Sequence, residues 1–401
     1  MVKVLLSAIQ CCPDQGSELG NGWHWATALA DAGHDVTVLT MSHYKEFIDA
    51  KARRDIHFRY IDMPESPLKR FSARLVPYDI YLRWQRAAFE LVAAEGHKYD
   101  IAHHVTWGSL HLGSLIWQLQ TPLVYGPIGG GQTAPTNYWR YFGRDWPFEL
   151  LRSASTGSLL RLNNRSRDTI RNSVVSLVTN SATATACRRL GAVNVRYMLA
   201  EGLPPEWIAD CRHQPTGTPL VLWVGRMLPR KAPSLAVQAF AKLREVMPAR
   251  MIMAGNGPLI DQVRAAVEQA GWSGDVEVPG HVPWDELKDL YDSASVFLFN
   301  SLRDSSGAQF LEAMGRGLPA VALNHHGIGD LDVGCAAVKV DLPRKPEDLP
   351  GRLAGAMQTI LRDGEWDARS AAATKWAAGH TWPAKAAAAT EIYEESLRIR
   401  G

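Results

Sequence analysis

The sequence predicts an α/β protein with two doubly wound parallel sheets, and three observations support this fold class. Short apolar runs that end in glycine-containing turns alternate with helical patterns along almost the whole chain. The 401 residues are enough to bury two cores of ordinary size. At residues 214–219 the composition shifts to Pro, Gly and Thr, as in an interdomain linker. We therefore expect a first domain over residues 1–213 and a second over residues 219–380.

The composition is that of a globular protein from a reducing compartment. Hydrophobic residues make up 46% and charged residues 21%, and the net charge of +2 gives no argument for a nucleic-acid partner. The five cysteines show no metal-ligand spacing, and their odd number argues against a disulfide framework. No run approaches the roughly 18 apolar residues of a membrane span, and the N-terminus enters a strand-like segment without a signal-peptide pattern. We expect a cytoplasmic protein.

The first domain is expected to open with a parallel βαβ unit. The predicted elements are a buried strand, a loop, a helix and a second strand at residues 3–8, 10–22, 23–32 and 35–40. The loop holds Gly16, Gly20 and Gly22, in a spacing that differs from the G-x-G-x-x-G of dinucleotide-binding proteins. These glycines either bring backbone amides close to a ligand or only turn the chain.

Two polar features follow later strands of the first domain. Further strands are predicted at residues 57–61, 100–104, 122–125, 176–179 and 194–198, with a helix at 78–95. His103 and His104 stand where one strand is expected to stop, and Gly129, Gly130 and Gly131 follow the next strand. Ligands of doubly wound sheets bind at the carboxyl ends of the strands, so both features are candidates for a ligand contact. The alternative for a single histidine is a packed or surface position.

The segment of residues 137–171 is both basic and aromatic. It carries seven arginines against three acidic residues, and its aromatic residues crowd into the first dozen positions. Together with Lys69, Arg70, Arg74, Arg83 and Arg86, it suits an anionic membrane surface or a phosphorylated acceptor. The alternative is a solvated face beside an aromatic core, because no contiguous amphipathic helix carries the aromatic residues.

The second domain is expected to begin with a strand whose end is rich in cations. The apolar run at residues 220–224 leads into Gly225, Arg226, Arg230 and Lys231, and a helix is predicted from about Pro233. The planar fork of arginine and the mobile charge of lysine, beside helix N-terminal amides, are suited to a diphosphate. The alternative is a group of surface cations in a loop.

Two more strand ends carry candidate ligand contacts. The strand at residues 250–254 leads into Gly255, Asn256 and Gly257, which we interpret as a close-packing turn. The strand at residues 275–278 leads toward His281 and Val282.

The stretch of residues 297–323 is the one around which the second domain is organised. An apolar run ends near Asn300, a polar turn contains Asp304, and a helix carries Glu312. The two carboxylates are eight residues apart, too far for helix neighbours, so Asp304 is placed in the loop. The alternative is a solvated acidic loop before an ordinary helix. After a strand at 336–340, helices are predicted at residues 346–362, 366–378 and 384–399, with a break at Trp382-Pro383 before the last one.

Taken together, these motifs resemble the retaining glycosyltransferases of family 4 over nearly the whole chain. In order, the motifs are GSELGNGW, DIAHH, YGPIGGG, VGRMLPRK, AGNGP, PGHV and an acidic stretch ending in LEAMGRGLPAVA. The resemblance implies the GT-B fold, in which two Rossmann-like domains face a central cleft. It also implies that a C-terminal helix, here residues 384–401, completes the first domain. The donor would bind mainly to the second domain and the acceptor to the first.

The resemblance also implies roles for individual residues. Arg226 and Lys231 match the positions that hold the donor diphosphate, and Glu312 matches the carboxylate that binds the ribose hydroxyls. Asp304 matches the acid that contacts the donor sugar, and one of His103 and His104, with His104 favoured, matches the active-site histidine. The expected catalytic residues are His103, His104, Arg226, Lys231 and Asp304. The residues expected around the donor are Gly16, Ser17, Gly225, Arg226, Lys231, Gly255, Asn256, Gly257, His281, Val282, Asp304, Ser305, Ser306, Gly307 and Glu312, and those on the acceptor side are Gly129, Gly130 and Gly131.

Two departures from the family pattern bear on the transferred sugar. The chain has Asp-Ser-Ser-Gly at residues 304–307, where the family usually has Glu-Gly-Phe-Gly, and Gly16-Ser17 where it has Gly-Gly. A shorter acid and two hydroxymethyl groups would reshape the sugar pocket, so the resemblance leaves the sugar undetermined.

The resulting hypothesis is a glycosyltransferase that uses a UDP- or GDP-linked sugar and retains the anomeric configuration. The acceptor would be a hydroxyl group of a glycan, a lipid-linked molecule or a small natural product. We expect no metal, no resident cofactor and no nucleic-acid partner, with a possible peripheral contact of the basic first domain at the inner face of the membrane. The alternatives are a nucleotide-sugar epimerase of the same architecture and an inactive or regulatory nucleotide-sugar-binding protein.

Overall fold

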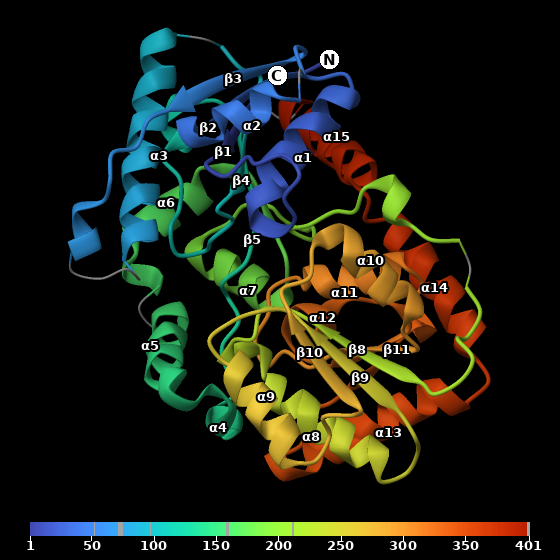
Figure 1. Ribbon diagram of the computed structural model, residues 1–401. Helices are drawn as coiled ribbons and strands as arrows, with labels where there is room; N and C mark the ends of the chain where they lie inside the picture. Colours follow the sequence, from blue (N-terminus) through green and yellow to red (C-terminus); the bar gives the residue numbers. More distant parts are fainter. Residues whose placement is uncertain (52, 71–74, 97, 158–159, 211, 399–401) are drawn as a thin grey trace. The chain divides into compact units, whose positions relative to one another are not determined.

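The computed structural model describes residues 1–398 apart from residues 52, 71–74, 97, 158–159 and 211 (Figure 1). Arg74, the side chain of Ser17 and the last three residues of the predicted segment 384–401 lie outside the described part. The chain divides into two compact units, and each is built on one parallel sheet. The first unit comprises Met1–Gly131, Thr156–Gly202 and Trp382–Gly401, and the second comprises Gln132–Ser155 and Leu203–Thr381.

This division differs from the expected boundaries at two places. Residues 203–213 were expected to end the first domain, but they belong to the second unit. Their contacts give the reason, because the Trp207 indole N–H donates to the Glu312 carbonyl at 3.0 Å and the Ala209 N–H donates to the Gly315 carbonyl at 2.8 Å. Residues 132–155 also belong to the second unit, where the Tyr138 hydroxyl donates to the Pro343 carbonyl at 2.9 Å.

The sheet of the first unit has seven strands, all parallel to their neighbours, in the order β3-β2-β1-β4-β5-β6-β7. In chain order they are β1 Lys3–Ala8, β2 Asp35–Met41, β3 Ile56–Ile61, β4 Ile101–Thr106, β5 Leu123–Ile128, β6 Ser173–Val178 and β7 Val195–Tyr197. The central strands β1, β4 and β5 are buried on both faces, as the inner strands of a parallel sheet require. The prediction of a doubly wound sheet in this half of the chain is confirmed.

Helices cover both faces of this sheet. They are α1 Ser17–Asp31, α2 Lys45–Asp49, α3 Val76–Glu95, α6 Asn164–Arg171, α7 Ser181–Leu190 and α15 Trp382–Arg398. One core joins α1 and α15 to the sheet and includes Trp25 and Tyr393. The core on the other face includes Tyr81 and Trp84 of α3. The helix α15 therefore brings the C-terminal end of the chain back into the first unit, as the family resemblance implied.

Two helix starts differ from the prediction. The glycine-rich stretch before Trp23 was expected to be a loop, but α1 begins at Ser17. Its glycines allow close packing, because a Cβ at Gly20 would lie 1.7 Å from the Gln15 carbonyl oxygen and one at Gly22 would lie 2.2 Å from that of Gln10. The last helix, α15, starts at Trp382 because proline is accommodated in a first helical turn, where no N–H partner is needed.

The sheet of the second unit has six parallel strands in the order β10-β9-β8-β11-β12-β13. They are β8 Leu220–Val224, β9 Arg250–Ala254, β10 Val276–Gly280, β11 Val296–Phe299, β12 Ala320–Leu323 and β13 Ala337–Val340. The helices of this unit are α4 Trp139–Phe142, α8 Pro233–Arg244, α9 Ile260–Gln269, α10 Trp284–Ser293, α11 Ala308–Gly315, α12 His326–Asp330, α13 Leu349–Arg362 and α14 Trp366–Ala378. The helix α5, Trp146–Gly157, lies where the chain passes between the units.

The order of strands positions the site in each sheet. Strand order reverses between β1 and β4 in the first sheet and between β8 and β11 in the second. Loops that leave two such strands diverge to opposite faces and open a crevice at the carboxyl edge, where doubly wound sheets bind ligands. The candidate residues after β8 and β11 therefore meet at one switch point. In Figure 1, α8 lies between α9 and α13 and packs against both.

Candidate functional site

The loops after β8 and β11 form one hydrogen-bonded structure at the switch point of the second sheet. The Leu302 N–H donates to the Arg230 carbonyl at 2.9 Å, and the Arg303 N–H approaches the same oxygen at 3.3 Å. Two stretches about 70 residues apart in sequence are thereby held together, with their side chains at the carboxyl edge.

Lys231 and Asp304, both predicted site residues, are in direct contact. The Lys231 Nζ donates to Asp304 Oδ2 and, at 3.3 Å, to Gln309 Oε1, and it lies 5.1 Å from the centre of the Phe299 ring. Burial alone would raise the pKa of Asp304, but the charges of Lys231 and Arg230 and hydrogen bonds outweigh burial and lower this pKa. Asp304 is therefore an ionised carboxylate that fixes the position of a buried ammonium group.

Further cations surround this pair. Arg230 Nη1 lies 3.9 Å from Asp304 Oδ2, and Arg303 forms an ion pair with Glu149 at 2.8 Å. Arg152 shares the same Glu149 carboxylate at 3.5 Å, and its pKa falls to about 10, first because of burial and then because of the charge of Arg303. We call the group of Arg152, Arg226, Arg230, Lys231 and Arg303, with Asp304 and Glu149, the cationic cluster.

The cationic cluster carries an excess of positive charge. Four of its five cationic side chains pair with only two carboxylates, Glu149 and Asp304. Burial lowers the pKa of Arg230, and the charges of Arg303 and Arg226 lower it further against the pull of Asp304. Arg226 is exposed, and no hydrogen bond or ion pair links its side chain to another residue of the described part. An anion that enters the cluster would relieve this repulsion.

The turn after Asp304 leads directly into α11. The Ser305 N–H donates to Asp304 Oδ1 at 2.9 Å, and Ser306 is buried. Gly307 caps α11 with φ 74° and ψ 67°, a left-handed conformation that favours glycine. A Cβ there would come within 2.9 Å of Ile328 Cδ1, so the position also lacks room for a side chain.

Glu312 lies one turn after Gln309 on the same face of α11. Its Oε2 accepts a hydrogen bond from the Tyr291 hydroxyl at 2.8 Å. Gln309 contacts Lys231, and Glu312 follows Gln309 by one turn of α11. Glu312 therefore lies near the Lys231–Asp304 pair, farther along the helix.

The glycines after β8 and β9 pack their turns together. A Cβ at Gly255 would lie 1.9 Å from the Gly225 carbonyl oxygen, and one at Gly257 would lie 2.7 Å from that of Met227. Asn256 uses its Oδ1 to accept from the Gly257 N–H at 2.7 Å. These contacts support the interpretation of this segment as a close-packing turn.

The residues expected near the base follow β10. His281 is exposed and Val282 is half-buried. The preceding Gly280 accepts from the Gly255 N–H at 2.7 Å, so the ends of β9 and β10 are joined at the same edge of the sheet.

The two histidines of the first unit lie inside β4, and the expectation that the strand stops at His104 is wrong. The strand continues to Thr106, and both side chains are fully buried. Because successive residues of a strand face opposite sides, His103 contacts α15 and His104 contacts α3. His103 forms hydrogen bonds with the Tyr393 hydroxyl at 2.6 Å and the Gly126 carbonyl at 2.8 Å.

His104 is held by three polar groups. Its Nδ1 lies 2.9 Å from Ser7 Oγ, and its Nε2 lies 3.2 Å from the Tyr81 hydroxyl and 3.4 Å from the Trp107 carbonyl. Burial is the main cause that lowers the pKa of His103 to about 3 and that of His104 to about 4. Both rings are therefore neutral at physiological pH, and the catalytic role expected for one of them stays a prediction.

The remaining expected residues of the first unit lie in two loops. Gly16 precedes the first residue of α1, and Gly129, Gly130 and Gly131 follow β5. The Gly131 N–H donates to Thr183 Oγ1 at 3.1 Å, and a Cβ at this glycine would lie 2.4 Å from Thr183 Cα. This glycine is thus needed for packing against the start of α7.

Glu18, in the first turn of α1, is a candidate that the sequence analysis missed. Its Oε1 is enclosed and has no hydrogen-bond partner among the described residues. Burial, with a smaller effect of the Glu201 charge, raises the pKa of Glu18 to about 8, although the Gly108 N–H opposes this shift. An acid directly after a glycine-rich turn and within a helix N-terminus was a signal that could have drawn attention to it.

Arg152, Arg303 and Gln309 were also not assigned to the site. Arg303 directly precedes Asp304, so proximity in sequence could have indicated it. Arg152 is a helix neighbour of Glu149 on α5, and only the fold brings this pair to Arg303, which is about 150 residues away in sequence.

The basic segment of residues 137–171 is divided between the two units. Tyr138 and Phe142 are buried in the second unit, whereas Phe148 on α5 is 58% exposed. No helix of the described residues has the length and apolarity needed to cross a bilayer. Peripheral membrane contact stays a prediction. Within the described part of the chain, no three His, Cys, Asp or Glu side chains gather as a metal site would require.

Two protein-family models match successive parts of the chain. The model for Glycosyltransferase Family 4 matches residues 23–166, and the model for Glycosyl transferases group 1 matches residues 211–332. Together they match more than half of the chain. The second match contains the cationic residues after β8, Asp304 and Glu312.

Curated relatives match shorter stretches. The D-inositol 3-phosphate glycosyltransferase of Frankia alni is 32% identical over 189 residues, which are 44% of this chain and 46% of that protein. The 2-deoxystreptamine glucosyltransferase of Streptomyces kanamyceticus is 31% identical over 147 residues, or 36% of each protein. The chain thus spans less than half the length of these relatives.

Solved structures show the same fold over the whole chain. Sucrose-phosphate synthase from Thermosynechococcus elongatus superposes with a TM-score of 0.71 at 18% identity, covering 99% of both chains. The Anabaena protein HepE, in complex with UDP and glucose, gives a TM-score of 0.63 at 15% identity and covers 98% of this chain and 100% of its own. With both family models matched in order on two parallel sheets of this kind, the chain belongs to the GT-B glycosyltransferases of family 4.

Proposed function

We propose that the protein transfers a sugar from a nucleoside-diphosphate donor to an acceptor hydroxyl, with retention of the anomeric configuration. The observation that carries this proposal is the cationic cluster at the switch point of the second sheet. Its excess of positive charge, together with the exposed guanidinium of Arg226, matches the charge of a diphosphate. The likeness to HepE, whose structure contains UDP and glucose, supports this choice of ligand.

The chemical role of the cluster would be to stabilise the departing diphosphate. Cleavage of the bond from the sugar to the phosphate places negative charge on the leaving oxygen, and preformed cations stabilise that charge most in a water-poor site. Asp304 holds Lys231 in place before the donor binds. In the reaction, Lys231 would be shared between Asp304 and the phosphate, and Arg226 would supply a planar pair of donors.

The other contacts with the donor are assigned from the family resemblance. Glu312 would accept hydrogen bonds from the ribose hydroxyls, and Asp304 would contact the transferred sugar. The backbone of His281 and Val282 would contact the base. The placement of Glu312 one helical turn from Gln309, which contacts Lys231, supports a ribose beside the diphosphate.

The acceptor is proposed to be a polyhydroxylated molecule bound on the first unit, near the carboxyl end of β4 and the loop of Gly129–Gly131. The relatives named for D-inositol 3-phosphate and 2-deoxystreptamine support this class of acceptor. Retention would follow from attack on the face that the diphosphate leaves, with the leaving phosphate accepting the proton of the nucleophile. Neither Asp304 nor Glu312 would then form a covalent intermediate.

A panel of radiolabelled UDP-, GDP- and ADP-sugars, incubated with the protein and a panel of acceptors, tests the proposal. A transferase releases free nucleoside diphosphate and labels the acceptor, and the product anomer measured by NMR matches that of the donor. An isomeric donor would instead indicate an epimerase, and binding without conversion would indicate a regulatory protein. A chelator control is included, since a transferase that relies on the cationic cluster keeps its activity in EDTA.

A further inference from the structure

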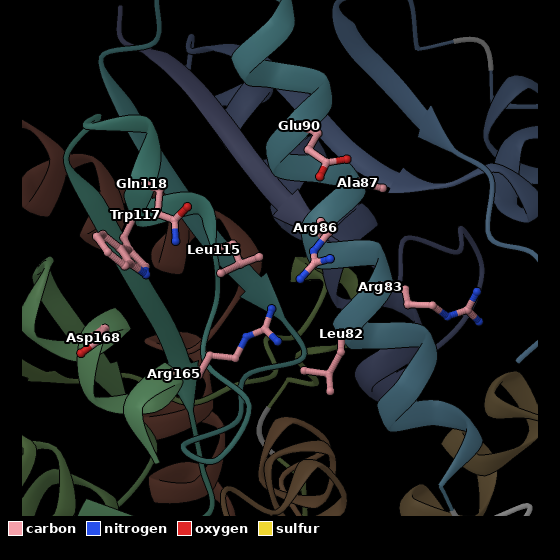
Figure 2. A pocket seen from close by; sticks show the side chains of 10 residues that line it. All are labelled: Leu82, Arg83, Arg86, Ala87, Glu90, Leu115, Trp117, Gln118, Arg165 and Asp168. Atoms are coloured by element: carbon pink, nitrogen blue, oxygen red, sulfur yellow. The ribbon is translucent and has the colours of Figure 1, made fainter. Parts of the chain in front are cut away.

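The first unit contains a second candidate binding site, a cavity of about 580 Å³ on its helical flank. It lies between α3, α6 and the short 3-10 helix Ile116–Leu119 (Figure 2). Its lining includes neither histidine of β4 nor any glycine of the loop after β5. The cavity is therefore separate from the carboxyl-edge crevice of this sheet.

Buried hydrogen bonds hold the walls of the cavity together. Gln85 Oε1 on α3 accepts from Ser114 Oγ at 2.8 Å and from the Leu115 N–H at 3.1 Å. Thr169 Oγ1 on α6 donates to the Ser114 carbonyl at 2.9 Å and accepts from the Ser114 N–H at 2.9 Å. The Gln85 Nε2 is buried and has no hydrogen-bond partner among the described residues, but the other bonds of this network tie α3, α6 and the segment before the 3-10 helix together and hold the cavity open.

Two guanidinium groups converge in the cavity. Arg86 on α3 and Arg165 on α6 point toward each other in Figure 2, whereas Arg83 points away and is bound to Asp79 at 3.0 Å. The Arg165 Nε is buried and has no hydrogen-bond partner among the described residues. Burial lowers the pKa of Arg165, and the charge of Arg86 lowers it further. Two like charges that face one cavity, one with an enclosed and unpaired N–H, are suited to an anion.

The rest of the lining is mixed in a way that fits a hydroxylated ring. Trp117, with Leu82 and Leu115, presents flat and apolar surface on the cavity wall. Glu90 and Gln118 supply hydrogen-bond acceptors and donors to the lining. Asp168 also lines the cavity, and its carboxylate lies 3.5 Å from Arg167.

We propose that this cavity binds an anionic carbohydrate, a sugar that carries a phosphate or a carboxylate. The anion would lie between Arg86 and Arg165, the ring would stack on Trp117, and hydroxyl groups would reach Glu90 and Gln118. This site would hold part of a charged glycan or a sugar phosphate on the flank of the first unit. It does not depend on the donor site proposed for the second unit.

Calorimetric titration of the full chain with glucose 6-phosphate and with glucuronate tests the proposal. We expect saturable binding of at least one probe, and the stronger of the two identifies the preferred anion. Arg86→Ala and Trp117→Ala are each expected to weaken the affinity about tenfold or more. Arg189→Ala, which removes an exposed arginine of α7 outside the cavity, should leave the affinity unchanged. Arg86 is exposed, so its replacement should not unfold the protein.

Three outcomes would overturn the proposal. The first is the absence of saturable binding of both probes to the unaltered protein. The second is loss of binding in Lys231→Ala but not in Arg86→Ala, which would place the sugar in the donor site. The third is equally tight binding of inorganic phosphate with no effect of Trp117→Ala, which would indicate an anion site without carbohydrate recognition. Methyl glucoside, which is uncharged, should bind more weakly than either probe.

Discussion

At the scale of single residues, the pairing of Lys231 with Asp304 is the feature on which catalysis is proposed to depend. The sequence indicated both residues separately, from a cation after one strand and an acid after another. The structure adds that they are in contact and that the neighbouring positive charges and hydrogen bonds outweigh burial and leave Asp304 ionised. Replacement of Lys231 therefore affects two groups, since it removes a cation from the ligand and leaves a largely buried carboxylate with Arg230 as its remaining cationic partner.

Lys231→Ala and Arg226→Ala are each expected to lower kcat/KM, because each removes one of the contacts proposed for the diphosphate. A loss of about 2–4 kcal/mol of transition-state stabilisation corresponds to a decrease of roughly 30- to 1000-fold. Release of nucleoside diphosphate from a labelled donor measures the effect. Lys242→Ala, which removes a lysine of α8 paired with Glu245, is the control and should keep full activity. Turnover at the level of the unaltered protein in both site variants would contradict the assignment.

Glu18→Gln is expected to change how stability depends on pH. The pKa of Glu18 is raised to about 8 from 4.5, so the folded protein binds this proton more tightly than the unfolded chain. Stability from this group is thus fully present below about pH 4.5 and is lost as pH rises toward 8. Glutamine does not titrate, so the variant does not lose this stability at high pH. The free energy of unfolding of the variant minus that of the unaltered protein should therefore increase by a few kcal/mol from pH 5 to pH 9. Urea unfolding at both pH values measures the difference, and a pH-independent difference would show that Glu18 titrates normally.

The histidine pair illustrates what residue-level reasoning could not supply. A strand end was predicted at His104, but the strand extends to Thr106 and both rings are enclosed by aromatic partners from α3 and α15. Tyr81 and Tyr393 are distant in sequence from the histidines. Their contribution could not be read from the motif itself.

At the scale of elements, two glycines explain why the first helix starts earlier than predicted. A glycine-rich stretch favours a loop by intrinsic propensity, yet residues 17–22 are helical because Gly20 and Gly22 let α1 pass close to the preceding backbone. This requirement comes from tertiary contact and has no local signature. By contrast, the turn of Gly255 to Gly257 was predicted correctly as a close-packing turn, because it lies directly between a strand and a helix.

Gly255→Ala is expected to destabilise the second unit and weaken donor binding. The new Cβ would lie 1.9 Å from the Gly225 carbonyl oxygen, and φ is 138°, a conformation that residues other than glycine rarely adopt. Strain and overpacking together should lower the free energy of unfolding by about 2–5 kcal/mol. The control is Gly351→Ala in α13, where no heavy atom lies within 4 Å of the added Cβ and helix propensity favours alanine by up to about 1 kcal/mol. Chemical denaturation of both variants tests this, and equal stabilities would refute the packing role.

At the scale of the whole molecule, the alternation of strands and helices was enough to predict two doubly wound sheets. Each βαβ unit is local in sequence, and parallel strands have a recognisable apolar run, so the fold class could be predicted without a structure. The limits of the units could not, because residues 132–155 and 203–213 resemble ordinary loops and helices. Their membership of the second unit depends on contacts such as that of Trp207 with the Glu312 carbonyl.

The cationic cluster also depends on this long-range organisation. Glu149 and Arg152 come from the segment that leaves the first unit, and they complete a group whose other members follow β8 and β11. Of the members that follow β8 and β11, Arg226, Lys231 and Asp304 were predicted from strand ends alone, whereas Arg303 was not assigned to the site. That Glu149 and Arg152 join the cluster could be learned only from the folded structure.

The most direct test of the account is calorimetric titration of the full chain with UDP, GDP and ADP. We predict one saturable site for at least one of them, with affinity at least tenfold weaker in the double variant Arg226→Ala/Lys231→Ala. At about 100 times the dissociation constant, the same nucleotide should stabilise the unaltered protein by roughly 2.7 kcal/mol. No binding of any of the three nucleotides, or binding that the double variant leaves unchanged, would contradict the central claim that this cluster holds a diphosphate.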